Sequence, residues 1–310
     1  MSLNVAGLTT YIEENKLEML QAAIAKGKTA SLIQMRTGIK ETSKFPVLST
    51  VVTLAADGCA RVATGSTALT QVSLTVGDIM VAEDLCIKTL KSYYLSTQMK
   101  NGSWDEAENP FEAEFMANKT AQLQKVLEVG IWQGDTGSGT NNIKYFDGLI
   151  KLIDAGSPVD GNADGVTAAV GILKSNVVDI FWGMVAAIPE QVRDMDDLIL
   201  FCGQDTFSLY ERALYEANMF NYSSNDTPGS SPFYGASGIQ IEAVHGLTGT
   251  NRCFLASASN LFVGTDMEGE DEDIRLYENP STTSLEYTSR FKYGTACGII
   301  TEVVEFTLVP

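Results

Sequence analysis

The stretch of sequence that decides the fold of this chain begins with Asn109-Pro110-Phe111-Glu112 and ends with Ile131-Trp132-Gln133-Gly134. Asn109 suits a helix N-cap, Pro110 suits the first helical position, and Glu112 stands where the acid of a capping box belongs. Gly134 is a natural stop. These signals predict one helix over residues 110–133, about 36 Å long at ~1.5 Å per residue.

The apolar residues of this helix form one face, because they recur mostly three or four positions apart. They are Phe111, Phe115, Leu123, Val126, Leu127, Gly130 and Ile131. Such a helix has two interpretations: a long surface helix of an ordinary enzyme, or a spine that carries two separate lobes. The flanking sequence has to decide between them.

The sequence before the helix starts with an amphipathic helical pattern over residues 9–25, whose apolar positions include Ile12, Leu20 and Ile24. A second short helical piece is predicted over residues 31–36. Both pieces are too small to hold a core of their own. We therefore expect this N-terminal segment to lie on another surface.

Two strand-like runs follow, over residues 47–54 and 61–76, and both are rich in Val, Thr, Ala and Ser. Asp57 and Gly58 lie between them, and Asp-Gly in this position is a hairpin signal. Few of the side chains can fill a core, so we expect a long hairpin that lies on a neighbouring subunit. Arg61 is its only strong cation and should meet carboxylates there. The alternative is a plain surface hairpin.

The sequence after the helix alternates between helix and strand, which is typical of an α/β lobe. The glycine-rich loop over 134–141 follows a helix and lacks a Gly-Lys-Ser/Thr ending, so it does not have the pattern of a phosphate loop. A helix is predicted over 166–188 with Asp164 as its cap, a buried strand over 198–202, and a further helix from Asp205 or Thr206 through Ala217. Strands then dominate, at 239–244, 253–256, 261–263, 274–277, 285–293 and 296–308.

Composition limits the function of the chain. Its 310 residues are 45% hydrophobic and 19% charged, as in a globular protein of one or two domains. No apolar run reaches the ~18 residues of a membrane helix, and no signal peptide is visible. The net charge of -18 argues against a nucleic-acid reader, because phosphate binding needs clustered Lys and Arg, but it does not exclude the wall of a container for DNA.

No motif commits the chain to a reaction. His245 is the one histidine, and five widely spaced cysteines suit reduced thiols, so we expect no catalytic residue, no cofactor and no metal site. Residues 160–165 copy half of an EF-hand loop, but Gly171 replaces the bidentate glutamate and a polar turn is expected. The alternative is a cytoplasmic α/β enzyme for a small molecule, in which Asp205, His245 and the Gly134 loop converge in a concave pocket.

Several stretches, taken in their order along the chain, resemble one family. They are Ile79-Met80-Val81-Ala82-Glu83-Asp84-Leu85, the run from Leu123 to Asp135, Phe146-Asp147-Gly148-Leu149-Ile150, and residues 260–266 and 290–294. In this order they resemble the major capsid protein of tailed DNA bacteriophages, which has the Hong Kong 97 fold. Each motif is short, and the resemblance is carried by their order.

The resemblance implies an α+β fold with an N-terminal arm over 1–45, an E-loop hairpin over 46–76, a P-domain over 77–145 and 257–292 that contains the spine helix 110–133, and an A-domain over 146–256 and 293–310. It implies a non-enzymatic shell protein that self-assembles into hexamers and pentamers of an icosahedral virion capsid. An encapsulin-type nanocompartment shell, which packages enzymes, is the alternative within the same fold.

The partners implied by the resemblance are other copies of the chain, a portal protein, scaffolding or decoration proteins, and packaged double-stranded DNA without sequence-specific contact. No membrane is involved, and assembly takes place in the host cytoplasm. The expected assembly contacts are Asp57, Gly58, Arg61, Ile12, Leu20 and Ile24. Deletion of residues 1–29 is expected to leave the subunit folded and to impair shells.

Two departures from the family matter. The phage that names the fold cross-links its subunits through a lysine on the E-loop, but residues 46–76 contain no lysine. We therefore expect a shell held by non-covalent contacts. The chain also lacks a large scaffold-like extension at its N-terminus, so any scaffold is expected to be a separate protein.

Overall fold

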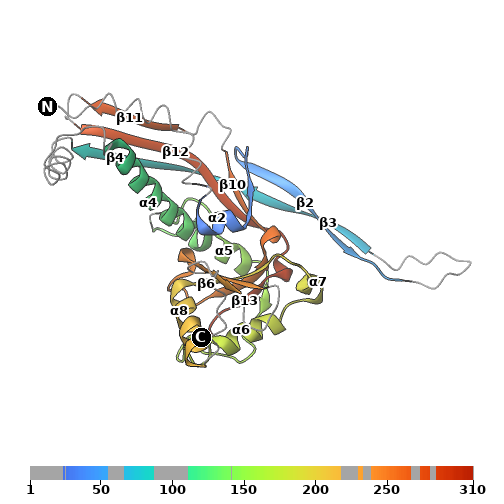
Figure 1. Cartoon of the computed structure of the whole chain (residues 1–310). Coiled ribbons are helices and arrows are strands. Elements are labelled where there is room, and N and C mark those ends of the chain that lie inside the picture. The colour runs from blue at the N-terminus through green and yellow to red at the C-terminus, as the bar shows by residue number, and fades with distance from the viewer. Residues whose placement is uncertain are drawn as a thin grey trace, which may run out of the picture.

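The computed structural model describes residues 24, 26–54, 66–86, 111–140, 142–217, 230–232, 239–266, 273–279 and 284–309. These residues form two lobes and a two-stranded hairpin that projects away from both (Figure 1). The first lobe is a five-stranded sheet with a long helix along it. The second lobe is a six-stranded sheet with helices on its outer face.

The first lobe is organised around its longest strand, which pairs antiparallel with three others. Its strands are β1 (Gln34–Arg36), β4 (Gly77–Cys86), β10 (Leu261–Thr265), β11 (Asp273–Asn279) and the long β12 (Ser284–Cys297). The predicted spine helix is confirmed as α4 (Phe111–Gln133). An ion pair between Lys119 of α4 and Glu83 of β4 ties the helix to the sheet.

The second lobe has the strand order β5-β13-β9-β6-β8-β7. Its strands are β5 (Val159–Asp160), β6 (Leu198–Gly203), β7 (Ser230–Pro232), β8 (Gln240–Val244), β9 (Cys253–Ser257) and β13 (Val304–Phe306). Its helices are α6 (Val177–Ala186), α7 (Glu190–Arg193) and α8 (Gln204–Glu216). The predicted alternation of helix, buried strand and helix is therefore confirmed, and β6 runs parallel to β8 but antiparallel to β9.

The sheet of the second lobe is buried on both faces, and β6 shows how. Ile199 and Phe201 belong to the core shared with α4, where the rings of Phe201 and Trp132 lie 5.3 Å apart. Leu198 and Leu200 point the other way, into the core under α6 and α8. Alternating side chains of one strand thus serve two cores, which explains why its sequence is apolar throughout.

The hairpin consists of β2 (Thr42–Val51) and β3 (Ser66–Thr75), paired antiparallel from Thr42 opposite Thr75 to Val51 opposite Ser66. A third small core fixes its root: Leu74 is buried against Phe262 of β10, and Phe45 lies 4.7 Å from the Phe262 ring. The distal part of the hairpin extends beyond the lobes (Figure 1). The predicted hairpin is thus confirmed, although its strands lie at 42–51 and 66–75 where 47–54 and 61–76 are predicted. Asp57, Gly58 and Arg61 lie outside the described residues.

The remaining elements are short. They are α2 (Lys28–Leu32), α5 (Leu149–Asp154), and the 3-10 turns η1 (His245–Leu247), η2 (Ala258–Asn260) and η3 (Ile300–Glu302). Both α2 and η1 contact α4, and α5 contacts both α4 and β12. Among the described residues, none of the helices combines the length and the apolar character needed to cross a membrane.

Two predicted helices are corrected. Residues 31–36 are helical only as far as Leu32, because residues 34–36 form β1 and pair with β10. The helix predicted over 166–188 begins only at Val177. Gly171 interrupts it with a φ of +69°, and Asn176 Oδ1 accepts a hydrogen bond from the Leu173 amide at 2.7 Å. Residues 166–168 instead bond with Val309 near the C-terminus.

One predicted strand boundary is also corrected. The sequence places a break near Gly294, but β12 continues unbroken from Ser284 to Cys297. A Cβ on Gly294 would lie 2.1 Å from the carbonyl oxygen of Thr75. Position 294 therefore requires a glycine because β12 and the end of β3 approach each other closely there. The glycine does not end the strand.

Candidate assembly surfaces

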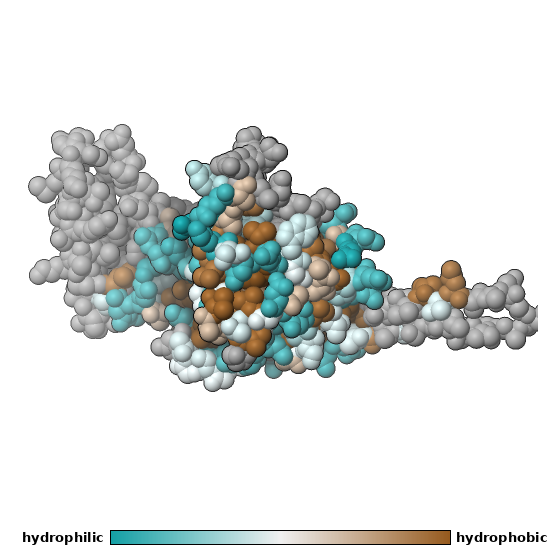
Figure 2. Space-filling model, turned by 90° about the horizontal axis from the view of Figure 1, so that it is seen from below, coloured by the Kyte–Doolittle hydropathy of each residue, from teal (hydrophilic) through white to brown (hydrophobic). Residues whose placement is uncertain are grey.

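The distal hairpin exposes apolar side chains on a part of the chain that reaches away from both cores. Leu54 is 93% exposed, Val52 78% and Leu69 66%. Figure 2 shows apolar surface on the projecting hairpin, separate from the body of the molecule. A two-stranded ribbon is marginal in water by itself, so this surface is suited to packing against another chain.

The N-terminal segment is anchored inside the chain from Ile24 onward. Ile24 is 1% exposed and belongs to the main core, which leaves almost none of its surface for a neighbouring subunit. Ile12 and Leu20 lie outside the described residues. The assembly role of these residues stays a prediction.

A buried polar network fastens this segment to the spine helix. The Thr29 amide lies 3.2 Å from both carboxylate oxygens of Glu128, and the Thr29 hydroxyl also donates to this carboxylate. Trp132 Nε1 donates to the same hydroxyl at 2.9 Å. Burial raises the pKa of Glu128, and the hydrogen bonds from Thr29 act in the opposite direction.

A second anchor reaches from α2 to the second lobe. Lys28 Nζ forms an ion pair with the buried Glu242 at 2.9 Å and donates to the Ala243 carbonyl oxygen at 2.9 Å. Residues 28 and 29 therefore hold α4 on one side and β8 on the other. The segment is placed where the two lobes meet.

Ion pairs join the loop after α4 to the start of α5. Lys151 lies 2.7 Å from Asp135 and 2.6 Å from Asp147. The hydrogen bond from Lys151 lowers the pKa of Asp135, and although burial would raise the pKa of Asp147, hydrogen bonds from Lys151 and Thr136 lower it. Lys151 is thus paired with two carboxylates, one on the loop and one just before α5.

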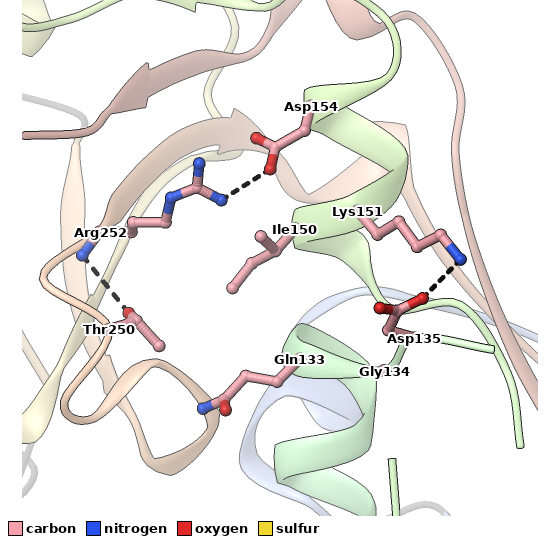
Figure 3. A pocket seen from close by; sticks show the side chains of 8 residues that line it. All are labelled: Gln133, Gly134, Asp135, Ile150, Lys151, Asp154, Thr250 and Arg252. Carbon is pink, nitrogen blue, oxygen red and sulfur yellow. Dashed lines mark hydrogen bonds and ion pairs between the residues drawn. The ribbon is translucent and has the colours of Figure 1, made fainter. Parts of the chain in front are cut away.

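A pocket of about 430 Å³ lies between this loop and the second lobe (Figure 3). Its lining residues are Gln133, Gly134, Asp135, Ile150, Lys151, Asp154, Thr250 and Arg252. The side chain of Ile150 points into its middle, between the Lys151–Asp135 and Arg252–Asp154 ion pairs. Asp205 and His245 are not among the lining residues, so the convergence that the enzyme alternative requires is not found at this pocket.

Arg252 bridges two elements beside this pocket. Its Nη1 atom lies 2.9 Å from Asp154 Oδ2 at the end of α5, and its Nη2 atom lies 3.2 Å from Glu305 Oε1 on β13. Glu305 is 5% exposed. Burial, opposed in part by Arg252 and reinforced by Asp154, raises the pKa of Glu305 to about 7.

Cys202, Cys253 and Cys297 are free and buried, and burial raises the pKa of each thiol, that of Cys297 to about 12. The described residues contain no group of three or more metal-ligating side chains. Residues 160–165 form the expected polar turn, in which Asn162 Nδ2 donates to the carbonyl oxygens of Val166 and Thr307 at 3.0 Å.

Comparison with known proteins identifies the fold. No family model and no curated protein matches the sequence. The structure resembles a chain of the satellite phage P4 procapsid, with 9% identity and a TM-score of 0.60, covering 94% of this chain and 99% of that one. It also resembles chains of the capsids of Myoviridae phage XM1 (14% identity, TM-score 0.57, 93% and 92% covered) and cyanophage A-1(L) (10%, 0.57, 93% and 92%).

The fold is that of tailed-phage capsid proteins. Within this capsid fold the motifs that carried the resemblance fall on defined elements. Residues 79–85 lie in β4, residues 123–135 end the spine helix α4, and residues 146–150 lead into α5. Residues 260–266 cover β10, and residues 290–294 lie inside β12.

The sequence did not predict the buried polar contacts that join distant segments of this capsid fold, such as Thr29 with Glu128 and Asp154 with Arg252. Thr29 and Glu128 are 99 positions apart, and Asp154 and Arg252 are 98 apart, so no local pattern relates them. The one available signal is the position of Glu128 directly after Leu127, beside the apolar face of α4. A charge at that place has to be paired if it is buried.

Proposed function

We propose that this protein is the major shell protein of a phage head, which self-assembles into hexamers and pentamers of an icosahedral capsid around double-stranded DNA. The observation that supports this best is the likeness to a procapsid chain over 94% of this chain and 99% of that one. Both lobes and the hairpin are included in a match of that extent.

Further observations agree with a structural role. The hairpin presents Val52, Leu54 and Leu69 away from both lobes. The net charge of -18 keeps a wall from trapping DNA on its inner surface. Portal, scaffolding or decoration proteins are further proposed partners. The virion capsid is the proposed location, and the host cytoplasm is the proposed place of assembly.

The proposed domain assignment follows the two lobes. The sheet around β12 with α4 corresponds to the P-domain, and the six-stranded sheet with α6 and α8 to the A-domain. The hairpin β2–β3 corresponds to the E-loop and makes its main contacts with a neighbouring copy. The expected boundary between residues 292 and 293 falls inside β12, and residues 293–297 still pair with β10 of the first lobe, so we place the boundary after Cys297.

Electron microscopy of the purified protein and of its source particles tests the proposal. Closed shells that contain double-stranded DNA are expected, whereas shells that contain a cargo enzyme would indicate a nanocompartment. A chain that stays monomeric under all assembly conditions would refute the shell function.

The hairpin contact is tested with Leu54→Asp, using Leu54→Met as the matched control. Leu54 is 93% exposed, so neither change should alter the folding of the monomer. We expect Leu54→Asp to lower the yield of shells about tenfold or more, because a buried charge would oppose each contact, while Leu54→Met assembles normally. Equal shell yields for both variants would show that the hairpin does not pack apolar side chains on a neighbour.

A further inference from the structure

Glu305 lies in a group of acids that exceeds the available positive charge. Among the residues that the structure describes, Arg252 is the cation that pairs with both Asp154 of α5 and Glu305 of β13, at 2.9 Å and 3.2 Å. Asp160 of β5 stands directly opposite Glu305 in the sheet. Three carboxylates and one guanidinium thus meet where the end of α5 reaches the second lobe.

The surroundings of Glu305 oppose its negative charge. Its side chain is buried, and its Oε1 atom, although close to Arg252, is left without a hydrogen bond. The charged groups that act on it are Arg252, Asp154 and Asp160, and two of these three are acids. A buried carboxylate that faces two other carboxylates favours its neutral form, and a neutral carboxyl can donate a hydrogen bond to Asp154.

We propose that Glu305, Asp154 and Arg252 form a proton-dependent latch between α5 and β13. In the closed state Glu305 is protonated and donates a hydrogen bond to Asp154, while Arg252 stays paired with Asp154. In the open state Glu305 is ionised, and repulsion from Asp154 and Asp160 loosens the contact between the end of α5 and the edge of the second lobe.

The sign of the pH dependence follows from this arrangement. The pKa of Glu305 is higher in the folded chain than in the unfolded chain, so the folded state binds more protons. The stability contributed by the latch is therefore complete below the unfolded pKa of about 4.3, and it is lost as pH rises through the folded pKa near neutrality.

Thermal unfolding of the unassembled full chain tests the latch, in steps from about pH 5 to 8.5. Glu305→Gln keeps the shape and the hydrogen-bond donor but cannot ionise. We expect the unfolding midpoint of the wild type to fall by about 2 °C or more relative to Glu305→Gln across this range. Glu211→Gln, on the exposed face of α8, is the matched control and should follow the wild type.

A second readout keeps the test decisive if Glu305→Gln folds poorly. The Gly161 amide donates to the Glu305 carbonyl oxygen at 2.8 Å, so its hydrogen-exchange protection in the wild type reports the β5–β13 contact. We expect this protection to fall as Glu305 ionises, and Asp154→Asn to move the change to lower pH. Parallel unfolding curves for the wild type and Glu305→Gln, or an exchange transition that Asp154→Asn does not move, would overturn the latch. Neither readout depends on shell formation.

Discussion

Thr29 joins the N-terminal segment to the spine helix through its hydroxyl group and its backbone amide. Its hydroxyl accepts from Trp132 and donates to Glu128, and its amide also points at the Glu128 carboxylate. All three residues are buried. Because a buried carboxylate is costly without donors, the position of Thr29 decides whether Glu128 can be tolerated inside the spine helix.

We expect Thr29→Val to destabilise the chain by about 1–3 kcal/mol, because it leaves Trp132 Nε1 without its acceptor and Glu128 without one donor at nearly unchanged volume. Thr29→Ser keeps the hydroxyl and should cost far less. Chemical denaturation followed by tryptophan fluorescence measures both. If the two variants unfold at the same denaturant concentration, the hydroxyl network does not hold the segment in place.

At the scale of elements, the long strand β12 joins the parts of the molecule. It pairs with β4, β10 and β11, and its Gly294 lies against the backbone where β3 passes into β4. The absence of a side chain at this point lets the root of the hairpin sit directly on the first lobe. The hairpin is therefore fixed at its base while its distal part extends outward (Figure 1).

Gly294→Ala should destabilise the chain by about 1–3 kcal/mol or more, because the added Cβ would lie 2.1 Å from the Thr75 carbonyl oxygen and the backbone must shift. The matched control is Gly139→Ala, whose Cβ would meet nothing within 4 Å. The control should stay within about 0.5 kcal/mol of the wild type. A thermal melt in which both alanine variants behave alike would rule out the need for close approach.

At the scale of the whole molecule, Ile24 marks the point from which the N-terminal segment is part of the core. From Ile24 onward it is part of the core and, through Lys28 and Thr29, touches both lobes. The expectation that residues 1–29 can be removed without loss of folding must therefore be revised. We expect a truncation that impairs assembly without impairing folding to end before Ile24.

Two truncations test this division. Removal of residues 1–23 keeps Ile24, Lys28 and Thr29, so the circular dichroism spectrum and the unfolding midpoint should stay close to those of the full chain while shells are impaired. Removal of residues 1–29 deprives the Glu128 carboxylate of its Thr29 donors and should destabilise the monomer by several kcal/mol, about the cost of an unsatisfied buried charge. Normal shells from the shorter truncation would show that the arm does not clamp neighbours.

Local sequence by itself determined the elements whose signals lie within one segment. The spine helix follows from its periodic apolar face, the hairpin from Asp-Gly between two strand-like runs, and β6 from a short apolar run before Gly203. Each of these predictions needs only neighbours in sequence. The expectation of a capsid fold came from the resemblance of several short motifs, taken in their order along the chain, to a known family.

Only the tertiary structure decided the features that depend on distant partners. Residues 34–36 become a strand because β10 offers an edge to pair with, and residues 166–168 stay out of α6 because they bond with Val309. Glu128 and Glu305 are buried because Thr29 and Arg252 reach them from about a hundred and about fifty positions away. Hydrogen bonds and charge pairs of this kind are set by how the chain packs, which local propensity and periodicity do not record.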